Sequence, residues 1–300
     1  MDANDYCKNF DYLTCKNKVN EICESYPFLK KIKIGSSCMG RDIDALKIGN
    51  FDDYVLFAAA FHGSEHITTN ILLMFIEQLC FALSCDSALA GLNARKALGG
   101  RGLIFVPRVN PDGCEISIHK RSACGALANE ISRLCNDDFT HWNANWRGVD
   151  INHNFDADWE ALHKKEQENG ILGPAKTRFG GFSPESEPET RALCEICRKS
   201  NIHHPLALHT QGQVIYWNYG DKCPKNSRKM AEIMATASNY ALDTPSGLAY
   251  GGGFKDWFIK EFDRPGFTVE IGRGENPLDT NDSIKLYFEV RELLMLCAIM

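Results

Sequence analysis

The sequence predicts an α/β fold in which a mainly parallel β-sheet is covered by helices on both faces. Short apolar runs of strand length alternate along the chain with segments whose apolar residues recur at helical spacing. Polar residues that carry chemistry directly follow several of these runs, at the sheet edge where open α/β folds bind ligands. With 44% hydrophobic and 24% charged residues over a length of 300, the composition is that of a globular protein with a large core.

The segment Tyr54–Leu83 is central to this prediction. Residues 54–61 form an unbroken apolar run that is long enough for a buried strand and too short for an independent helix. After residues 62–66, apolar side chains recur at helical spacing as far as Leu83. A strand that turns into a helix places the turn at the carboxyl edge of the sheet, and this turn carries His, Glu and His within five residues.

The segments before and after this centre predict further elements in order. The first half of the chain predicts an amphipathic helix at residues 10–22 and a hairpin whose two strands are residues 31–34 and 43–48. A short apolar strand follows at residues 103–106 and ends in a turn with Pro and Gly at residues 110–113. Residues 114–150 give only a weak pattern and are expected to be rich in loops. Residues 149–155 are expected to end at another edge of the sheet. Residues 156–185 show little periodicity and predict a long surface loop. A capping box at residues 186–189, with Ser186 as the N-cap, predicts the start of the next helix. Three strands follow at residues 205–208, 214–217 and 267–271, and a helix at residues 283–299 closes the chain.

The charge and composition of the chain limit the kinds of binding partner and the cellular location that we expect. A net charge of −6 and a pI near 5.9 argue against nucleic acid or an anionic membrane surface. No apolar stretch of twenty residues is present, so no membrane span is expected. The N-terminal residues have neither a basic nor an apolar signal region, so we expect a cytoplasmic protein with its 13 cysteines reduced. The sequence leaves the oligomeric state open.

The polar residues at the strand ends predict a catalytic zinc site. Catalytic zinc takes three protein ligands and keeps one position open. His62 and Glu65 stand three apart across the strand–helix turn, and His209 ends a separate strand. One Zn²⁺ per chain on these ligands would activate a water molecule, for which Glu270 near the end of FTVEIG is the candidate general base.

The same five residues also allow a different interpretation. His-x-x-Glu-His on one helix is the inverted zincin arrangement, in which His62 and His66 are ligands and Glu65 is the base. That arrangement requires the helix to begin before His62. Residues 54–61 indicate a strand, and Gly63-Ser64 suits a helix start better than a helix interior, so we favour the first interpretation.

The ordered motifs HGSE, VNPDG, GVDINHNF, SEPET, LHTQG, GGFKDW and FTVEIG resemble the signature of the zinc carboxypeptidase family. The resemblance runs from His62 to Glu270, and it implies a single catalytic domain over residues 1–300. It also implies a single-domain α/β/α sandwich with a mixed, roughly eight-stranded sheet. His62, Glu65 and His209 fall on the family's metal ligands, and Glu270 falls on its catalytic glutamate. The segments WNANWRGVDINHNF, LHTQGQVIYW and GFKDWFI are similar to the bacterial branch that cleaves γ-D-glutamyl–diamino acid bonds in murein peptides.

Departures from the family pattern bear on the substrate. Digestive-type members grip the substrate's terminal carboxylate with an Asn-Arg pair, where this chain has Asn152-His153; histidine offers one charge-assisted bond instead of a two-pronged donor. The slot of the family's oxyanion-stabilising arginine falls on Asn143, with Arg147 or His141 as replacements. For Arg147 the competing interpretation is a solvated turn residue.

Two further positions are candidates for substrate contact. The family's mobile-loop tyrosine aligns nearest Leu248, so Tyr250 is its candidate replacement, against simple packing within the loop. Lys255 matches the position that sets side-chain preference in the family and therefore predicts an acidic group on the substrate. The competing interpretation is a surface lysine at a helix start.

Together these observations predict a zinc-dependent metallopeptidase that hydrolyses an amide bond in a small murein-derived peptide. A C-terminal metallocarboxypeptidase and an N-acyl-amino-acid amidase are the alternatives within enzymes. A catalytically inert zinc-binding domain that recognises peptides is the alternative of another class. The presence of Glu270 argues against it, because binding alone needs no base.

Overall fold

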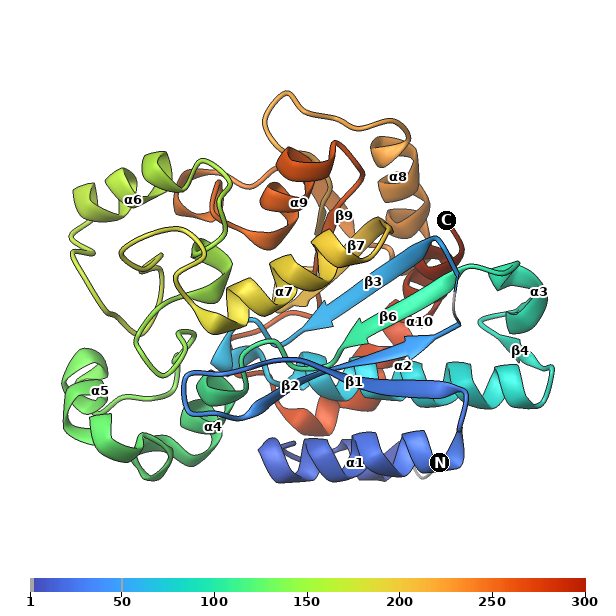
Figure 1. The fold of residues 1–300 in the computed structure, drawn as a ribbon, viewed down its shortest axis with the longest axis horizontal. Coiled ribbons are helices and arrows are strands. Elements are labelled where there is room, and N and C mark those ends of the chain that lie inside the picture. Colours follow the sequence, from blue (N-terminus) through green and yellow to red (C-terminus); the bar gives the residue numbers. More distant parts are fainter. Residues whose placement is uncertain (1–2, 50) are drawn as a thin grey trace.

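In the computed structural model, which describes residues 3–49 and 51–300, the chain is built around a mixed sheet of eight strands (Figure 1). From one edge to the other, the strands follow the order β1-β2-β6-β3-β7-β10-β8-β9. Their bounds are β1 Leu29–Ser36, β2 Asp42–Ile48, β3 Tyr54–Ala59, β6 Gly102–Val106, β7 Ile202–His209, β8 Val214–Tyr216, β9 Ala241–Asp243 and β10 Phe267–Glu270. The predicted eight-stranded α/β arrangement is confirmed. The short strands β4 (Ala88–Leu89) and β5 (Leu92–Asn93) form a separate hairpin.

The pairing of the strands explains why the sheet is mixed. The centre is parallel, with β3 between β6 and β7 and with β10 beside β7. The β1–β2 hairpin adds antiparallel strands at one side, as the sequence predicts, and β8 runs antiparallel to β10 at the other. The parallel strands therefore bring the ends of β3, β7 and β10 to one edge, and the functional residues lie there.

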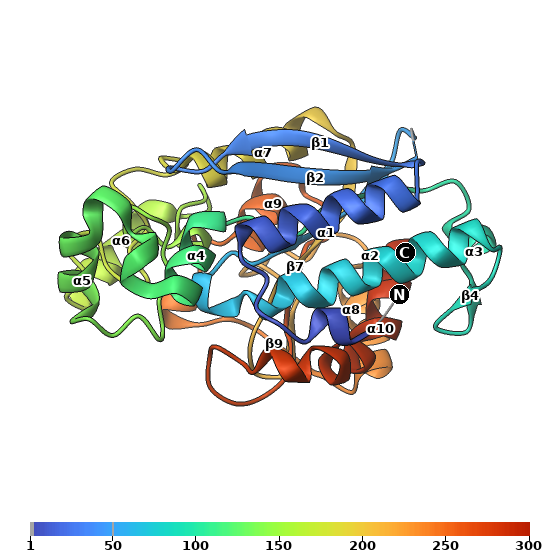
Figure 2. The ribbon, with the colours of Figure 1, turned by 90° about the horizontal axis from the view of Figure 1, so that it is seen from below.

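Helices cover both faces of the sheet, and each face has its own apolar core. One core contains side chains from α1 (Tyr12–Ser25), α2 (Ile67–Ser84), α3 (Ala94–Leu98), α8 (Ser227–Ser238) and α10 (Ser283–Ile299). The opposite core contains side chains from α7 (Pro188–Lys199) and α9 (Phe254–Phe262). Figure 2 shows α1 and α7 on opposite sides of β1 and β2.

Helix α2 is a core helix. The segment Gly63–Ser84 is long and apolar enough to pass a test for a membrane span, but 78% of its apolar window is buried inside the protein. It packs on the sheet and against α10, which accounts for the apolar residues on nearly all its sides.

Three expectations about local structure are wrong. Residues 110–113 do not form a turn, because Asn110 caps α4 (Pro111–His119) by accepting a hydrogen bond from the Gly113 N–H at 2.8 Å. Asn-Pro suits a helix start as well as a turn. Residues 149–155 contain no strand, because Ile151–His153 form a 3₁₀ turn that is capped by the Asp150 carboxylate. The capping box predicted at Ser186 is not formed: Glu187 is the N-cap of α7 and makes no side-chain capping bond, and Ser186 Oγ donates to Glu187 Oε1 at 2.9 Å.

The regions predicted as loops also contain helices. Residues 114–150 include most of α4 and all of α5 (Ala128–Cys135), and residues 156–185 include α6 (Trp159–Glu168). Helix α4, α5 and Trp142 share a small apolar cluster of their own. In Figure 1, α5 and α6 lie beyond the arrowheads of β3 and β6, on the side of the sheet where the functional residues gather.

Candidate active site

Two imidazoles and one carboxylate converge at the carboxyl edge of the sheet. Nδ1 of His62 lies 2.8 Å from Glu65 Oε1, and Nδ1 of His209 lies 2.9 Å from Glu65 Oε2. One ligand atom from each residue lies within 4.8 Å of the others, an arrangement that could hold a metal ion. The structure therefore brings together the three residues predicted as ligands, although His209 is 144 positions from Glu65.

The backbone after β3 is shaped to present the first two of these residues. Ala60 adopts a positive φ of 54°, and its N–H donates to Thr68 Oγ1 at 2.9 Å. Residues Gly63–Glu65 form a 3₁₀ turn before α2 begins at Ile67. A Cβ atom at Gly63 would lie 2.3 Å from the carbonyl oxygen of Gly113, so only glycine fits this turn.

His209 is fixed from three sides. It ends β7, its ring stacks on Phe61 with centroids 5.0 Å apart, and its Nδ1 contacts Glu65. The side chain is buried, and its Nε2 has no hydrogen-bond partner among the described residues. The stacking on Phe61 and the contact with Glu65 therefore hold the ring in a pose that directs Nδ1 at the convergence point.

A second carboxylate orients His62. Asp150 Oδ1 lies 3.0 Å from His62 Nε2, and Asp150 Oδ2 accepts a hydrogen bond from the Arg178 backbone N–H at 2.8 Å. Metal-binding histidines commonly bond a carboxylate through the ring nitrogen that does not face the metal. Burial would raise the pKa of Asp150, but the charges of His62 and His153 prevail and hold it well below its usual range.

The charges at the convergence point are strongly coupled. Burial lowers the pKa of His62, yet the carboxylates of Glu65 and Asp150 outweigh it and raise that pKa well above the usual value. In the same way, His62 and His209 hold the pKa of Glu65 at about 2 against the effect of burial. Glu65 is therefore ionised. A carboxylate with two imidazoles is a ligand set that suits Zn²⁺, and binding of the ion would release the proton of His62. The residues present fit a zinc ion.

Glu270 lies beside this group. It ends β10, and it is the register partner of His209 on the neighbouring parallel strand β7. Glu270 lines the same cleft as His62 and Asp150. Burial and the nearby Glu65 raise the pKa of Glu270 to about 8 in the polypeptide alone. A carboxylate in this position can accept a proton from a molecule in the cleft.

The inverted zincin interpretation is wrong. Residues 62–66 do not lie on one helix, because α2 starts only at Ile67. His66 is buried outside the converging group, and burial lowers its pKa to about 3. It is a neutral residue at the start of the helix.

The cleft has a volume of about 220 Å³ and is lined mainly by polar side chains. Of the predicted substrate-binding residues, Asn152, His153 and Lys255 line it, as does Asn143. The other lining residues are His62, Asp150, Thr177, Arg178, Tyr216, Pro245, Ala249, Gly253, Asp256, Thr268 and Glu270.

Residues Asn152 and His153 are held by contacts outside the cleft. Asn152 Oδ1 accepts a hydrogen bond from the Phe254 N–H at 3.0 Å, which leaves its amide nitrogen free to donate. His153 Nδ1 lies 2.8 Å from Oε1 of the buried Glu166. Oε2 of Glu166 contacts His163 Nδ1 at 3.1 Å and accepts from the Gly180 N–H. Each member of the Asn152-His153 pair therefore has one nitrogen available for a ligand.

Residues 16–288 match the zinc carboxypeptidase family. The chain belongs to this family. The zinc peptidase is 35% identical over 284 residues to gamma-D-glutamyl-L-diamino acid endopeptidase 1 of Lysinibacillus sphaericus, an alignment that covers 94% of this chain and 70% of the relative. It is 22% identical to carboxypeptidase B of Bos taurus, over 89% of this chain and 63% of that protein.

A solved structure supports the fold. The zinc peptidase resembles bovine thrombin-activatable fibrinolysis inhibitor with a TM-score of 0.76 at 20% identity, covering 98% of this chain and 97% of the other. Membership of the family implies zinc as the cofactor, in agreement with the converging His62, Glu65 and His209.

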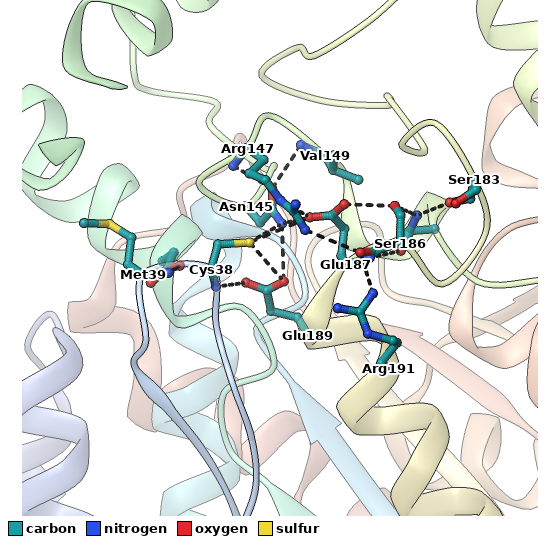
Figure 3. A network of polar contacts seen from close by, with 12 residues as sticks. Cys38, Met39, Asn145, Arg147, Val149, Ser183, Ser186, Glu187, Glu189 and Arg191 are labelled. Carbon is teal, nitrogen blue, oxygen red and sulfur yellow. Dashed lines mark hydrogen bonds and ion pairs between the residues drawn. The ribbon is translucent and has the colours of Figure 1, made fainter. Parts of the chain in front are cut away.

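Arg147 is not among the residues that line the cleft of the zinc peptidase, so the structure does not support its predicted role in substrate binding. Its Nε lies 2.9 Å from Oε2 of Glu187, whose side chain is buried, and Figure 3 shows the guanidinium directed at this carboxylate. The buried negative charge draws the arginine away from the substrate side. His141 is also outside the cleft lining and forms an ion pair with Glu275 at 3.3 Å.

The carboxylates of Glu187 and Glu189 lie close to Cys38 and form a second group with metal-ligand chemistry (Figure 3). Their oxygens already accept hydrogen bonds: Asn145 Nδ2 lies 2.7 Å from Glu187 Oε2 and 3.3 Å from Glu189 Oε2. Burial raises the pKa of the Cys38 thiol, so this sulfur is a poor ligand. The group is a structural network that fixes α7 to the segment after Trp142.

Tyr250 is also not among the residues that line the cleft, so the structure does not support its predicted contact with the substrate. Its ring stacks on Tyr219 with centroids 5.2 Å apart, and Lys165 Nζ lies over its other side at 5.7 Å. Packing within the loop, the competing interpretation, describes it. Tyr216 of β8 is a tyrosine that does line the cleft.

Sequence reasoning missed Asp150, Glu166 and Arg178. Asp150 lies in the motif GVDINHNF, but its role depends on His62 Nε2, which is 88 positions away. Arg178 lines the cleft and is exposed, and no hydrogen bond or ion pair of its guanidinium occurs within residues 3–49 and 51–300. It lies in a loop without periodicity, so nothing in the local pattern marks it.

Proposed function

We propose that this zinc peptidase hydrolyses the γ-D-glutamyl–diamino acid amide bond of a small murein-derived peptide. His62, Glu65 and His209 would hold one zinc ion per chain, and Glu270 would act as general base. The observation that carries the catalytic part is the position of Glu270, one strand away from His209 and in the same cleft. The relative that is 35% identical, an endopeptidase for γ-D-glutamyl-L-diamino acid bonds, supports the substrate class.

The residues of the chain divide the chemistry among them. Zinc, when bound, supplies a Lewis acid that polarises the scissile carbonyl and makes a water molecule more acidic. Glu270 accepts the proton of the attacking water as the new C–O bond forms. Glu270 then delivers that proton to the leaving nitrogen as the C–N bond breaks. Arg178 and Asn143 line the cleft and provide donors for developing negative charge.

Donors around the cleft suit carboxylates on a peptide. The amide nitrogen of Asn152 and Nε2 of His153 are the available atoms of a pair whose other atoms are already bonded. Each offers a single hydrogen bond and not the bidentate grip of an arginine. This supports a substrate other than the ordinary C-terminal residue of a protein chain.

We also propose that the enzyme acts in the cytoplasm as one catalytic domain over residues 1–300. All 13 cysteines, which lie in the described part of the chain, are free thiols, and most are buried. Free thiols are typical of reducing compartments. The site draws on residues from 62 to 270, which supports a single domain.

A panel of substrates tests the proposal. The purified zinc-loaded enzyme is incubated with L-Ala-γ-D-Glu-meso-diaminopimelate and with a blocked dipeptide that ends in Phe, and products are identified by mass. We expect cleavage of the γ-D-glutamyl bond. Cleavage of the dipeptide alone would instead support a carboxypeptidase or an N-acyl-amino-acid amidase. An inert wild type with a full complement of zinc would support a peptide-binding domain.

A further inference from the structure

Lys255 and Asp256 form a buried ion pair in the wall of the cleft. Lys255 Nζ contacts Asp256 Oδ1, and the two side chains are only 5% and 4% exposed. Both residues are at the start of α9 and line the cleft together with Glu270. The competing interpretation of a surface lysine is therefore wrong, and the positive charge of Lys255 is compensated by Asp256.

Counting hydrogen bonds shows what the pair still offers. An ammonium group has three donors, and Lys255 uses two of them, on Asp256 and on the Asn218 carbonyl oxygen at 2.5 Å. Asp256 accepts from Lys255 through Oδ1 and from the Gly251 N–H at 2.9 Å through Oδ2, while its two oxygens have about four acceptor sites. One donor and two acceptor sites remain.

The pair lies on the path that a substrate side chain would take from the reacting bond. Thr268 and Glu270 are two residues apart on β10 and both line the cleft, so they point to the same face. At 3.3 Å per residue, Thr268 is roughly 7 Å along the strand from Glu270. The stem of Lys255 is beside Gly266, just before β10, because a Cβ atom on that glycine would lie 3.6 Å from Lys255 Cγ. The cleft therefore extends along β10 from the catalytic carboxylate toward the ion pair.

The two opposite charges of the pair determine which substrate group can bind beside it. A carboxylate alone would meet the remaining donor of Lys255 but would be repelled by Asp256. An ammonium alone would meet Asp256 but would be repelled by Lys255. A group that carries both charges on one carbon can satisfy both partners, and desolvation of the pair is costly unless such partners are supplied.

We propose that the Lys255–Asp256 pair recognises a zwitterionic amino acid head group at the end of the substrate's side chain. The residue on the leaving side of the scissile bond would then be a diamino dicarboxylic acid rather than a simple diamino acid such as lysine. The inference rests on the proposed function, because it concerns the substrate of the same cleft.

The test compares three peptides L-Ala-γ-D-Glu-X that differ only in the end of the X side chain. X is meso-diaminopimelate, with both charges; L-lysine, with the ammonium alone; or L-2-aminopimelate, with the carboxylate alone. We expect kcat/KM for the first peptide to exceed each of the others by tenfold or more, since one charge-assisted bond is worth at least about that factor. Lys255→Met should remove most of the advantage over the lysine peptide, and Asp256→Asn most of the advantage over the aminopimelate peptide.

This reciprocal pattern separates recognition from structural support. A purely structural pair would lower kcat/KM for all three peptides by the same factor, and that result would overturn the inference. Asparagine keeps an acceptor for the Gly251 N–H; if Asp256→Asn still fails to fold, as judged by circular dichroism, Lys255→Met alone decides. Equal cleavage of the three peptides by the wild type would overturn this inference and leave the proposed function intact. Cleavage of none of them would overturn the proposed function and the inference with it.

Discussion

Nδ1 of His153 lies 2.8 Å from Oε1 of Glu166, a carboxylate that is completely buried. The contact fixes which ring nitrogen of His153 faces the protein and leaves Nε2 for the cleft. An arginine at the position of His153 would have a guanidinium of fixed planar geometry. Here His153 and Glu166, from different segments, together provide a donor of fixed orientation. We therefore propose that Glu166 is a positioning residue for substrate binding by His153.

Replacing Glu166 with Gln should raise KM for the murein peptide about tenfold and change kcat little, because the histidine loses its fixed orientation while Glu270 is untouched. Steady-state kinetics of the tripeptide measures the split. Glu168→Gln is the matched control, since Glu168 is exposed on the same helix α6. A fall in kcat with constant KM would contradict the positioning role.

Replacing Glu270 with Gln should lower kcat by a factor of about 10² to 10⁴, the range for loss of a general base. Zinc content and thermal midpoint should stay unchanged, because Glu270 is not among the three converging ligands. Glu275→Gln controls for the substitution itself, since Glu275 is exposed and, among the described residues, forms an ion pair only with His141. Retained activity in Glu270→Gln would show that another group activates the water.

Removing the metal should abolish hydrolysis and lower the thermal midpoint, because a ligand that binds only the folded state stabilises it. Zinc analysis by atomic absorption is expected to give one ion per wild-type chain and much less in His209→Ala. His203→Ala is the control, because His203 is also on β7 but contacts His204 and not Glu65. Loss of zinc from both variants would show that damage to β7, and not a missing ligand, is responsible.

The buried Glu189 should make stability depend on pH. Burial raises the pKa of Glu189 to about 7, so the folded state holds this proton more tightly than the unfolded state does. The stabilisation is complete below the unfolded pKa, near 4.5, and is lost as pH rises through 7. The total change is on the order of 3 kcal/mol, at 1.36 kcal/mol per pKa unit. Urea unfolding from pH 4 to 9 should show this slope in the wild type.

The same measurements on two variants isolate the effect. Glu189→Gln cannot ionise, so its unfolding free energy should fall less across this range than that of the wild type. Glu195→Gln, on the exposed side of α7, should follow the wild type. Parallel profiles for all three proteins would mean that Glu189 is not the group responsible.

Arg147 and Arg178 should behave in opposite ways when each is replaced by Met. Arg147→Met leaves the buried Glu187 without its cationic partner, so we expect a loss of about 1–2 kcal/mol in unfolding free energy with unchanged kinetics. Arg178→Met removes an exposed cleft cation whose guanidinium has no hydrogen bond or ion pair among the described residues, so we expect lower kcat/KM with an unchanged thermal midpoint. A kinetic defect in Arg147→Met without loss of stability would restore it as a substrate-binding residue.

The parts of the protein that the sequence predicts well are those set by periodicity. His62, His209 and Glu270 follow apolar runs whose strand character is unambiguous, so their common edge can be inferred before any contact is known. The chemistry of Arg147, Tyr250 and Lys255 is different, because it depends on Glu187, Tyr219 and Asn218, which come together only through the tertiary fold. Asn110-Pro111 shows a local limit, since the same dipeptide begins a helix or a turn.

Strand β10 pairs with β7 on one side and with β8 on the other, which limits the insertions and deletions that this segment can tolerate. Thr268 and Glu270 face the cleft, while Val269 between them is completely buried in the core. One inserted or deleted codon within β10 would exchange these two sets and point the catalytic carboxylate into hydrocarbon. We therefore expect insertions and deletions to be tolerated in the loop before Phe267 far better than within the four residues that follow.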